Sequence, residues 1–179
     1  NSRVFHTGCP SIDLINSKTI KMKKNFFEKI NTLGNKINYK NPYIVAINHP
    51  LSTDIHSNKN NTKIFLNALA KRKEQIFFLW PNPDAGTDLV SKKIREFREF
   101  SKSNNFTFLI NLSPENYITL IANATCLVGN SSSFIREGSK LGKPAIIVGN
   151  RQNNRELGNN VIRSSFNILE INKKIDMQI

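Results

Sequence analysis

A short polar turn between two apolar runs is the part of this sequence best suited to binding chemistry. The residues Gly129-Asn130-Ser131-Ser132-Ser133 follow the apolar run 126–128 and precede an amphipathic segment, a pattern typical of a strand, a tight turn and a helix. The start of a helix leaves backbone N–H groups and hydroxyls pointing out of the turn, with the positive end of the helix dipole behind them. Such a turn could hold a phosphate, although serines are also the most common helix caps.

Glu137 is the residue of the predicted helix that could add to this chemistry. It lies about one and a half turns from the helix start at 3.6 residues per turn, close enough to the turn to accept hydrogen bonds from a sugar diol. A carboxylate for ribose beside a helix start that holds phosphate indicates a nucleotide ligand. The alternative interpretation is that Glu137 is a solvated side chain and that the serines only cap the helix.

The elements that must position these residues follow from an alternation of strands and helices. Gly142 and Pro144 end the helix after the serine turn, and residues 145–148 form a second apolar run. Further strands are predicted at 43–48, 76–80, 106–110 and 161–163, and helices at 61–72, 87–101 (capped by Thr87), from 114, and from 168. This predicts an α/β fold with a doubly wound, mostly parallel, Rossmann-like sheet, helices on both faces, and ligand binding at the strand carboxyl ends.

Residues 1–40 are predicted to be a remnant of a preceding lobe and a linker, and residues 41–179 the nucleotide-binding domain. The chain starts without methionine or a signal-peptide pattern, which indicates a piece of a longer polypeptide. In the first segment we expect a short strand at 3–5, a helical turn or two at 10–16 and a helix at 22–33. Phe26, Phe27 and Ile30 would form the apolar side of that helix and would stay exposed without a partner.

Composition is that of an ordinary folded domain. With 179 residues, 39% hydrophobic and 22% charged, the chain fits one globular domain, and it has no apolar run of membrane-spanning length. Its two cysteines, Cys9 and Cys126, lie far apart, and Cys126 falls in a predicted buried strand. We therefore expect a reduced, cytoplasmic protein without a metal site or a cofactor.

The net charge of +13, from 26 Lys and Arg against 13 Asp and Glu, raises nucleic-acid binding as an alternative. The distribution of the charge argues against it, because lysines crowd the first forty residues at Lys18, Lys21, Lys23, Lys24, Lys29, Lys36 and Lys40. The sequence also lacks zinc-finger spacing, an aromatic RNA-binding signature and a basic zipper. A positive surplus suits an anionic small ligand equally well.

Polar residues gather at the predicted carboxyl ends of the strands. In chain order they are His49, Ser52, Thr53 and Asp54; Asn82 and Asp84; Asn111 and Ser113; the serine turn; and Arg151, Gln152, Arg155 and Glu156. Because these ends share one edge of a parallel sheet, five loops would converge on one crevice. His49 is suited to general acid or leaving-group chemistry near neutral pH. Arg151 and Arg155 could clamp phosphate or could pair with Glu156.

Four motifs occur in a fixed order. They are His49-Pro50-Leu51-Ser52-Thr53-Asp54, Pro81-Asn82-Pro83-Asp84-Ala85-Gly86, Gly129-Asn130-Ser131-Ser132-Ser133 with Arg136-Glu137, and Gly149-Asn150-Arg151-Gln152 with Asn154-Arg155-Glu156. Together they resemble the hydrolysing UDP-N-acetylglucosamine 2-epimerases of sialic-acid and related sugar biosynthesis, over residues 3 to about 163. The resemblance implies a two-lobed fold like that of the GT-B glycosyltransferases, with this chain as the nucleotide-binding second lobe and most of the first lobe missing.

The resemblance also implies a reaction and a set of roles. In that family UDP is eliminated from UDP-N-acetylglucosamine through a 2-acetamidoglucal, and water then adds to give N-acetylmannosamine with inversion at C2. Matched by position, His49 would assist catalysis at the diphosphate, Asn82 and Asn111 would line the nucleotide pocket, Ser131 and Ser132 would bind phosphate, Glu137 the ribose, and Arg151 the charged part of the ligand. Asn111 stands where some members have a histidine. The implied partners are a UDP-sugar, the first lobe and, at full length, further copies of the enzyme, with no nucleic acid, membrane or cofactor.

The related non-hydrolysing epimerases resemble the chain in fold but typically have a Gly-His-Arg-Arg-Glu loop and two consecutive glutamates on the helix. Here His49 is followed by Pro50 and Glu137 by Gly138, and both departures favour the hydrolysing branch. In the family the carboxylates that move the C2 proton belong to the first lobe, so we expect this chain alone to be inactive. The alternatives are an epimerase of a UDP-diacetamido-trideoxyhexose, a non-hydrolysing epimerase, and the donor-binding lobe of a GT-B glycosyltransferase.

Overall fold

A mostly parallel sheet forms the centre of the structure. The computed structural model describes residues 3–17, 20–23, 25–34, 38 and 40–179, so Lys18, Lys24 and Lys36 of the basic segment lie outside the described residues. In these ranges the strands are β1 (Thr32–Gly34), β2 (Tyr43–Ile47), β3 (Gln75–Leu79), β4 (Phe106–Leu109), β5 (Cys126–Gly129), β6 (Ala145–Val148) and β7 (Val161–Ser164). Their order is β1-β4-β3-β2-β5-β6-β7, with β1 antiparallel to β4 and the other neighbours parallel. The predicted doubly wound sheet is confirmed.

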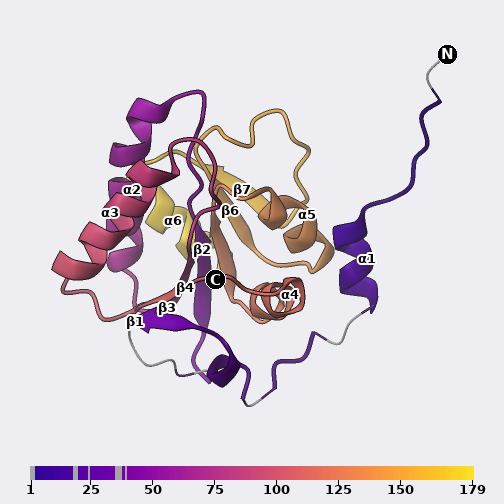
Figure 1. The fold of residues 1–179 in the computed structure, drawn as a ribbon, viewed down its shortest axis with the longest axis horizontal. Helices are drawn as coiled ribbons and strands as arrows, with labels where there is room; N and C mark the ends of the chain where they lie inside the picture. The colour runs from indigo at the N-terminus through magenta and orange to yellow at the C-terminus, as the bar shows by residue number, and fades with distance from the viewer. Residues whose placement is uncertain (1–2, 18–19, 24, 35–37, 39) are drawn as a thin grey trace.

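Helices cover both faces of the sheet (Figure 1). The helices α2 (Ile55–Ala70), α3 (Thr87–Phe100) and α6 (Ile168–Gln178) pack on one face, and α1 (Pro10–Ser17), α4 (Pro114–Ala122) and α5 (Ser132–Lys140) lie on the other. Since side chains alternate along a strand, β2 supplies Ile44 and Ala46 to one core and Val45 and Ile47 to the other. Of the helices described, none is long and apolar enough to cross a membrane.

The N-terminal segment differs from its prediction. The helical turn expected at 10–16 is confirmed by α1, but residues 3–5 form no strand and the helix expected at 22–33 is wrong. In its place lie a 3₁₀ helix (Phe27–Lys29) and β1, whose Thr32 pairs with Leu109 of β4. Pairing with the sheet edge overrides the helical periodicity, because propensity is a weak guide where tertiary contacts compete.

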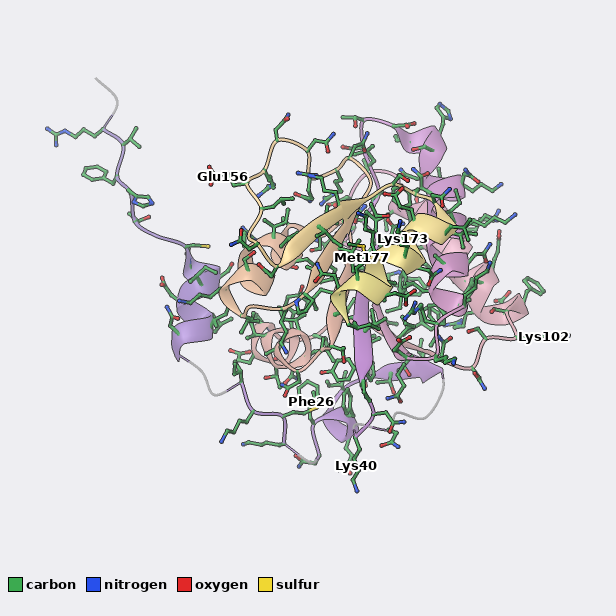
Figure 2. All side chains as sticks on the ribbon, turned by 180° about the vertical axis from the view of Figure 1, so that it is seen from behind. Phe26, Lys40, Lys102, Glu156, Lys173 and Met177 are labelled. Atoms are coloured by element: carbon green, nitrogen blue, oxygen red, sulfur yellow. The ribbon has the colours of Figure 1, made fainter. Side chains whose placement is uncertain are left out.

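Phe26, Phe27 and Ile30 are not left exposed, so that expectation is wrong as well. Phe26 and Ile30 are each 8% exposed and belong to the core beside α4 and α5. The ring of Phe27 stacks on that of Phe77 in β3, with centroids 5.0 Å apart. Figure 2 shows Phe26 against the body of the domain, whereas the first described residues extend away from it.

Helix α2 begins at Ile55, six residues before its predicted start at 61. Asp54 caps it, with Oδ1 accepting a hydrogen bond from the backbone N–H of Ser57 at 3.2 Å. Its first two turns bury Asn58 and Thr62 in place of apolar side chains. The apolar period that predicts helices is therefore absent from the first turns of α2.

The order of the strands reverses at β2, which has β3 on one side and β5 on the other. In doubly wound sheets, ligands bind in the crevice beyond the strand carboxyl ends at such a switch point. The residues that follow β2 and β5 are therefore the first place to look for a site.

Candidate functional site

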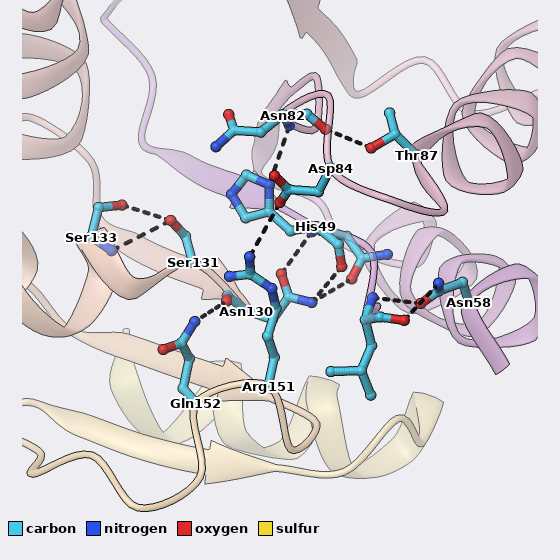
Figure 3. Close-up of polar contacts among 12 residues, drawn as sticks. His49, Asn58, Asn82, Asp84, Thr87, Asn130, Ser131, Ser133, Arg151 and Gln152 are labelled. Carbon is cyan, nitrogen blue, oxygen red and sulfur yellow. Dashed lines mark hydrogen bonds and ion pairs between the residues drawn. The ribbon is translucent and has the colours of Figure 1, made fainter. Parts of the chain in front are cut away.

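His49 lies just beyond the carboxyl end of β2, beside the turn that follows β5 (Figure 3). The residue is 7% exposed, and its Nδ1 accepts a hydrogen bond from the backbone N–H of Asn82 at 3.3 Å. A neutral imidazole that accepts at Nδ1 carries its proton on Nε2. His49 therefore offers an N–H donor in its uncharged form.

The charge state of His49 follows from its surroundings. Burial and, secondarily, the positive charge of Arg151 lower the pKa of His49 to about 4, while the carboxylate of Asp84 acts in the opposite direction. His49 is thus neutral at neutral pH in the free protein. A general-acid role near pH 7 would need a bound anion, because negative charge nearby raises the pKa of a histidine.

The turn after β5 is shaped by a glycine. Gly129 has a φ of 144°, and a Cβ there would lie 1.8 Å from the carbonyl oxygen of Ile47 in β2, so glycine allows the two strands to meet at this point. Ser131 caps α5, with Oγ accepting from the backbone N–H of Ser133 at 3.4 Å. The hydroxyl of Ser133 is hydrogen-bonded to those of Ser131 and Tyr117.

Two pockets open at this edge of the sheet and adjoin at Ser132, which lines both. The smaller has a volume of about 440 Å³ and contains both polar and apolar side chains, among them His49, Trp80, Asn82, Asn111, Leu112, Tyr117 and Ser131. The larger has a volume of about 820 Å³ and is mainly polar, lined among others by Ser52, Thr53, Asp84, Arg151 and Arg155. Loops after β2, β3 and β6 contribute to the larger pocket, and loops after β2, β3, β4 and β5 to the smaller one. All five predicted loops therefore reach this edge of the sheet, where they line two adjoining pockets.

The structure brings most of the predicted site residues to these pockets. His49, Asn82, Asn111 and Ser131 line the smaller pocket, and Arg151 lines the larger. Asn111 adopts a φ of 53°, the left-handed conformation that asparagine tolerates better than most residues. The residues share walls of one crevice, which is the geometric condition for acting on one ligand.

Glu137 is placed differently. It is 5% exposed and lies outside the lining of both pockets, so the interpretation as a solvated side chain is wrong. Its Oε1 lies 3.5 Å from Nη2 of Arg136, and Oε2 has no hydrogen-bond partner within the described part of the chain. Buried carboxylate oxygens are normally hydrogen-bonded, so Glu137 retains an acceptor for a further donor.

Arg151 forms an ion pair with Asp84, at 3.3 Å between Nη2 and Oδ2, rather than with Glu156. The pair joins the loop after β6 to the loop after β3, as Figure 3 shows near His49. Thr87, predicted to cap α3, instead donates a hydrogen bond to the carbonyl of Asn82 at 2.6 Å, and Gly86 precedes the helix at a φ of 88°. These contacts hold the loop after β3 across the crevice.

The sequence places Asn130 and Gln152 among the polar residues at the strand ends and Asn48 at the end of an apolar run, but it does not predict that their side chains are buried. Asn48, Asn130 and Gln152 are each 3% exposed, although the sequence suggested that the polar side chains of the serine turn point out to a ligand. The sequence shows only that polar residues follow apolar runs directly. This pattern does not distinguish a side chain that contacts a ligand from one that is hydrogen-bonded inside the protein. Over the ranges that the structure describes, no group of three or more His, Cys, Asp or Glu residues is placed to hold a metal ion.

The sheet order, the crevice at the switch point and the helix start beside it define a lobe of a GT-B-like fold. The solved UDP-GlcNAc 2-epimerase of Methanocaldococcus jannaschii, in complex with UDP-GlcNAc and UDP, shares this fold with a TM-score of 0.67. The alignment covers 97% of this chain and 47% of that one, at 14% sequence identity.

The chain belongs to the UDP-N-acetylglucosamine 2-epimerase family, whose sequence model matches residues 1–178. The UDP-N-acetylglucosamine 2-epimerase of Neisseria meningitidis serogroup B is 28% identical over 159 residues, which are 89% of this chain and 40% of that protein. The UDP-N,N'-diacetylbacillosamine 2-epimerase (hydrolyzing) of Legionella pneumophila is also 28% identical, with the same shares of 89% and 40%. The chain therefore spans less than half the length of these relatives.

Proposed function

We propose that the chain is the UDP-binding lobe of a hydrolysing UDP-N-acetylglucosamine 2-epimerase, which converts UDP-N-acetylglucosamine and water into N-acetylmannosamine and UDP. The observation that carries the proposal is the meeting of His49, Ser132 and Arg151 around adjoining pockets at the switch point of the sheet. The residues after His49 and Glu137, which are Pro50 and Gly138, support the hydrolysing branch, as does the similarity to the hydrolysing 2-epimerase of Legionella.

In this proposal the start of α5 and Arg151 hold the diphosphate. A helix start supplies free N–H groups and a positive dipole end, and Arg151 can exchange its partly exposed partner Asp84 for phosphate oxygens. The smaller pocket, with Trp80 and Leu112 in its lining, takes the nucleobase. The neutral Nε2–H of His49 donates to the leaving diphosphate as the C1–O bond breaks.

Glu137 takes the ribose hydroxyls in the same proposal. Its Oε2 is buried and lacks a partner among the residues described, and a buried acceptor without a hydrogen bond costs about 1–3 kcal/mol. A diol that donates to this oxygen would remove that cost. Because Glu137 lies outside the pocket linings, its use requires the side chain or the neighbouring Arg136 to shift when the nucleotide binds.

The rest of the enzyme is part of the proposal. Residues 41–179 are assigned as the nucleotide-binding domain and residues 1–40 as a remnant of a first lobe with its linker, although β1 of that segment joins the sheet of the second domain. The first lobe would supply the carboxylates that move the C2 proton, so the chain alone is inactive. The full-length enzyme is proposed to be a cytoplasmic homo-oligomer.

A second candidate is an epimerase of a UDP-diacetamido-trideoxyhexose. It is favoured by the Legionella relative, which is as similar to the chain as the Neisseria protein, at 28% identity each. The test is to incubate the full-length protein with each UDP-sugar and to identify the released amino sugar. Release of N-acetylmannosamine alone supports the first candidate, and release of the diacetamido product alone supports the second.

UDP is expected to stabilise the isolated chain, because the helix start, Arg151 and the smaller pocket all lie within it. A ligand that binds the native state alone adds about 2.7 kcal/mol at a hundredfold excess over Kd. Thermal unfolding at increasing UDP measures the shift. Arg151→Met should reduce the shift strongly, whereas Arg98→Met, which removes an exposed charge on α3 outside both pockets, should leave it unchanged. A folded chain with no shift at millimolar UDP would contradict the proposed function.

Glu137→Ala is expected to weaken UDP binding far more than binding of inorganic diphosphate, because only the nucleotide carries the diol. Loss of hydrogen bonds to a charged acceptor typically costs about 1.5–3 kcal/mol. Calorimetry with both ligands measures the difference, and Glu137→Gln, which keeps the shape and one acceptor oxygen, should recover part of it. Equal losses for the two ligands would mean that Glu137 acts through the fold of α5.

A further inference from the structure

The side chain of Asn130 is hydrogen-bonded to both the backbone N–H and the backbone carbonyl of His49. Its Oδ1 accepts a hydrogen bond from the His49 N–H at 2.7 Å, and its Nδ2 donates to the His49 carbonyl at 2.8 Å. This is the pairing that a neighbouring strand would give, supplied here by one amide beyond the end of β5 (Figure 3). Asn130 is 3% exposed, so these two hydrogen bonds are shielded from water. Hydrogen bonds are electrostatically stronger in the protein interior than in water.

Asn130 is itself held by residues from two other elements. Its Nδ2 also donates to Oδ1 of Asn48 at 3.2 Å, and Nδ2 of Asn48 donates to the hydroxyl of Thr62 in α2 at 2.9 Å. Nε2 of Gln152, in the loop after β6, donates to the Asn130 carbonyl at 2.9 Å. Both hydrogens of the Asn130 amide are therefore used inside the protein, which leaves Asn130 no free amide donor for a ligand.

The effect of this network falls on the His49 ring. The ring accepts from the Asn82 N–H at Nδ1, a bond of 3.3 Å that is already long and that a shift of the His49 backbone would break. With that bond intact, the proton of the neutral ring is on Nε2. With it broken, both tautomers become accessible, and the donor toward the ligand is present for only part of the time.

We propose that Asn130 is a positioning residue for His49, which holds the His49 backbone so that the ring keeps Nδ1 on the Asn82 N–H and presents Nε2–H to the ligand. The role of the ligand rests on the function proposed above, but the tautomer does not. Asn130 touches no reacting atom in this scheme. It acts through His49, and its contribution is the fraction of enzyme in which the donor is correctly placed.

The first test is made on the chain without any ligand. Nitrogen NMR of the imidazole rings reports the tautomer, with His49 assigned by the loss of its signal in His49→Gln. We expect a protonated Nε2 and an unprotonated Nδ1 from about pH 8 down to about pH 5. The ring stays neutral over this range because burial and Arg151 lower the pKa of His49 to about 4, although Asp84 acts in the opposite direction. A wild-type His49 with its proton on Nδ1 would overturn the proposal, whatever the variants do.

Asn130→Asp supplies the matched variant. The aspartate keeps the acceptor for the His49 N–H but places an oxygen against the His49 carbonyl and against Oδ1 of Asn48, both of which are acceptors. We expect mixed tautomers of His49 in Asn130→Asp, and in Asn130→Ser if the aspartate variant does not fold. The control is Asn105→Asp, because the Asn105 amide donates to backbone carbonyls in the last turn of α2 and in the loop before β3, and Asn105 lines neither pocket. This variant should lower stability and leave the His49 tautomer unchanged.

A readout in the full-length enzyme separates positioning from a purely structural role. Misplacement of a group by about 1 Å can cost about 10²-fold in rate, so Asn130→Asp should lower kcat by up to that amount while UDP affinity changes less than about threefold. A folded Asn130→Asp or Asn130→Ser variant with the wild-type His49 tautomer and wild-type kcat overturns the proposal. If instead the tautomer changes as expected but UDP fails to bind the wild-type chain, the failure lies in the proposed function and not in the role of Asn130.

Discussion

His49→Ala in the full-length enzyme is expected to lower kcat by about 10²–10⁴-fold and to change UDP affinity by less than about tenfold. The reason is that negative charge builds up on the leaving diphosphate as the C1–O bond breaks. A donor at Nε2 therefore interacts more strongly with the transition state than with the bound substrate, and such interactions appear in kcat when they are removed. Steady-state kinetics combined with UDP titration measures both quantities.

His49→Gln tests whether the donor or the proton matters. Glutamine keeps an N–H donor but does not release a proton readily, so partial recovery of kcat indicates hydrogen bonding, and no recovery indicates proton transfer. His56→Ala is the matched control, because His56 lies exposed in the first turn of α2. If His49 only braces the loop before Pro50, both His49 variants will lose thermal stability and keep the wild-type kcat per folded molecule, which would remove the catalytic role.

The parallel part of the fold could be predicted because β2, β4, β5 and β6 are buried on both faces. The runs at 43–48, 126–128 and 145–148 are apolar throughout except for Asn48, and they correspond to β2, β5 and β6 with bounds within a residue or so. Order along the chain then limits how parallel strands can be connected. The N-terminal segment gave no such signal, because β1 has only three residues at the sheet edge and is specified by its pairing with β4.

The site could be predicted only as far as residue type and strand ends allow. His49, Asn82 and Arg151 were placed at the crevice because each follows an apolar run, and the structure brings them to its walls. The direction of a side chain, however, depends on partners from distant segments. Asn130 turns inward because the backbone of His49, 81 residues away in the chain, offers it two hydrogen bonds.

The charge state of the site likewise depends on contacts that the sequence does not show. Burial dominates the lowered pKa of His49, and Arg151 comes second, yet neither the depth of His49 nor the pairing of Arg151 with Asp84 follows from the motifs. From the sequence alone, a histidine at a strand end is therefore expected to act as an acid near neutral pH. In the folded site His49 is instead a neutral hydrogen-bond donor. The experiments on His49 discriminate between these chemistries.

Gly129→Ala is expected to cost about 4 kcal/mol of unfolding free energy or more, in the range that marks a severe backbone conflict. The new Cβ would lie 1.8 Å from the carbonyl oxygen and 2.8 Å from the carbonyl carbon of Ile47, and both atoms belong to the backbone of the central strand β2. Moving β5 away would also break the hydrogen bond from the Asn130 N–H to the Ile47 oxygen at 3.1 Å. Since a domain of this kind is stable by about 5–15 kcal/mol, the variant should unfold at a much lower urea concentration.

Gly142→Ala provides the control for this result, because Gly129 and Gly142 both have positive φ but only Gly142 has room for a Cβ atom. Gly142 has a φ of 62°, and nothing lies within 4 Å of a Cβ built there, so only the left-handed backbone cost of about 1–2 kcal/mol applies. Urea unfolding of both variants, followed by UDP titration of whatever remains folded, gives the comparison. Equal destabilisation of the two would show that β2 and β5 can separate, and that the close approach at Gly129 is not what shapes the crevice. The contact of Gly129 with Ile47 predicts a much larger loss of unfolding free energy in Gly129→Ala than in Gly142→Ala. It also predicts that Gly142→Ala retains UDP binding.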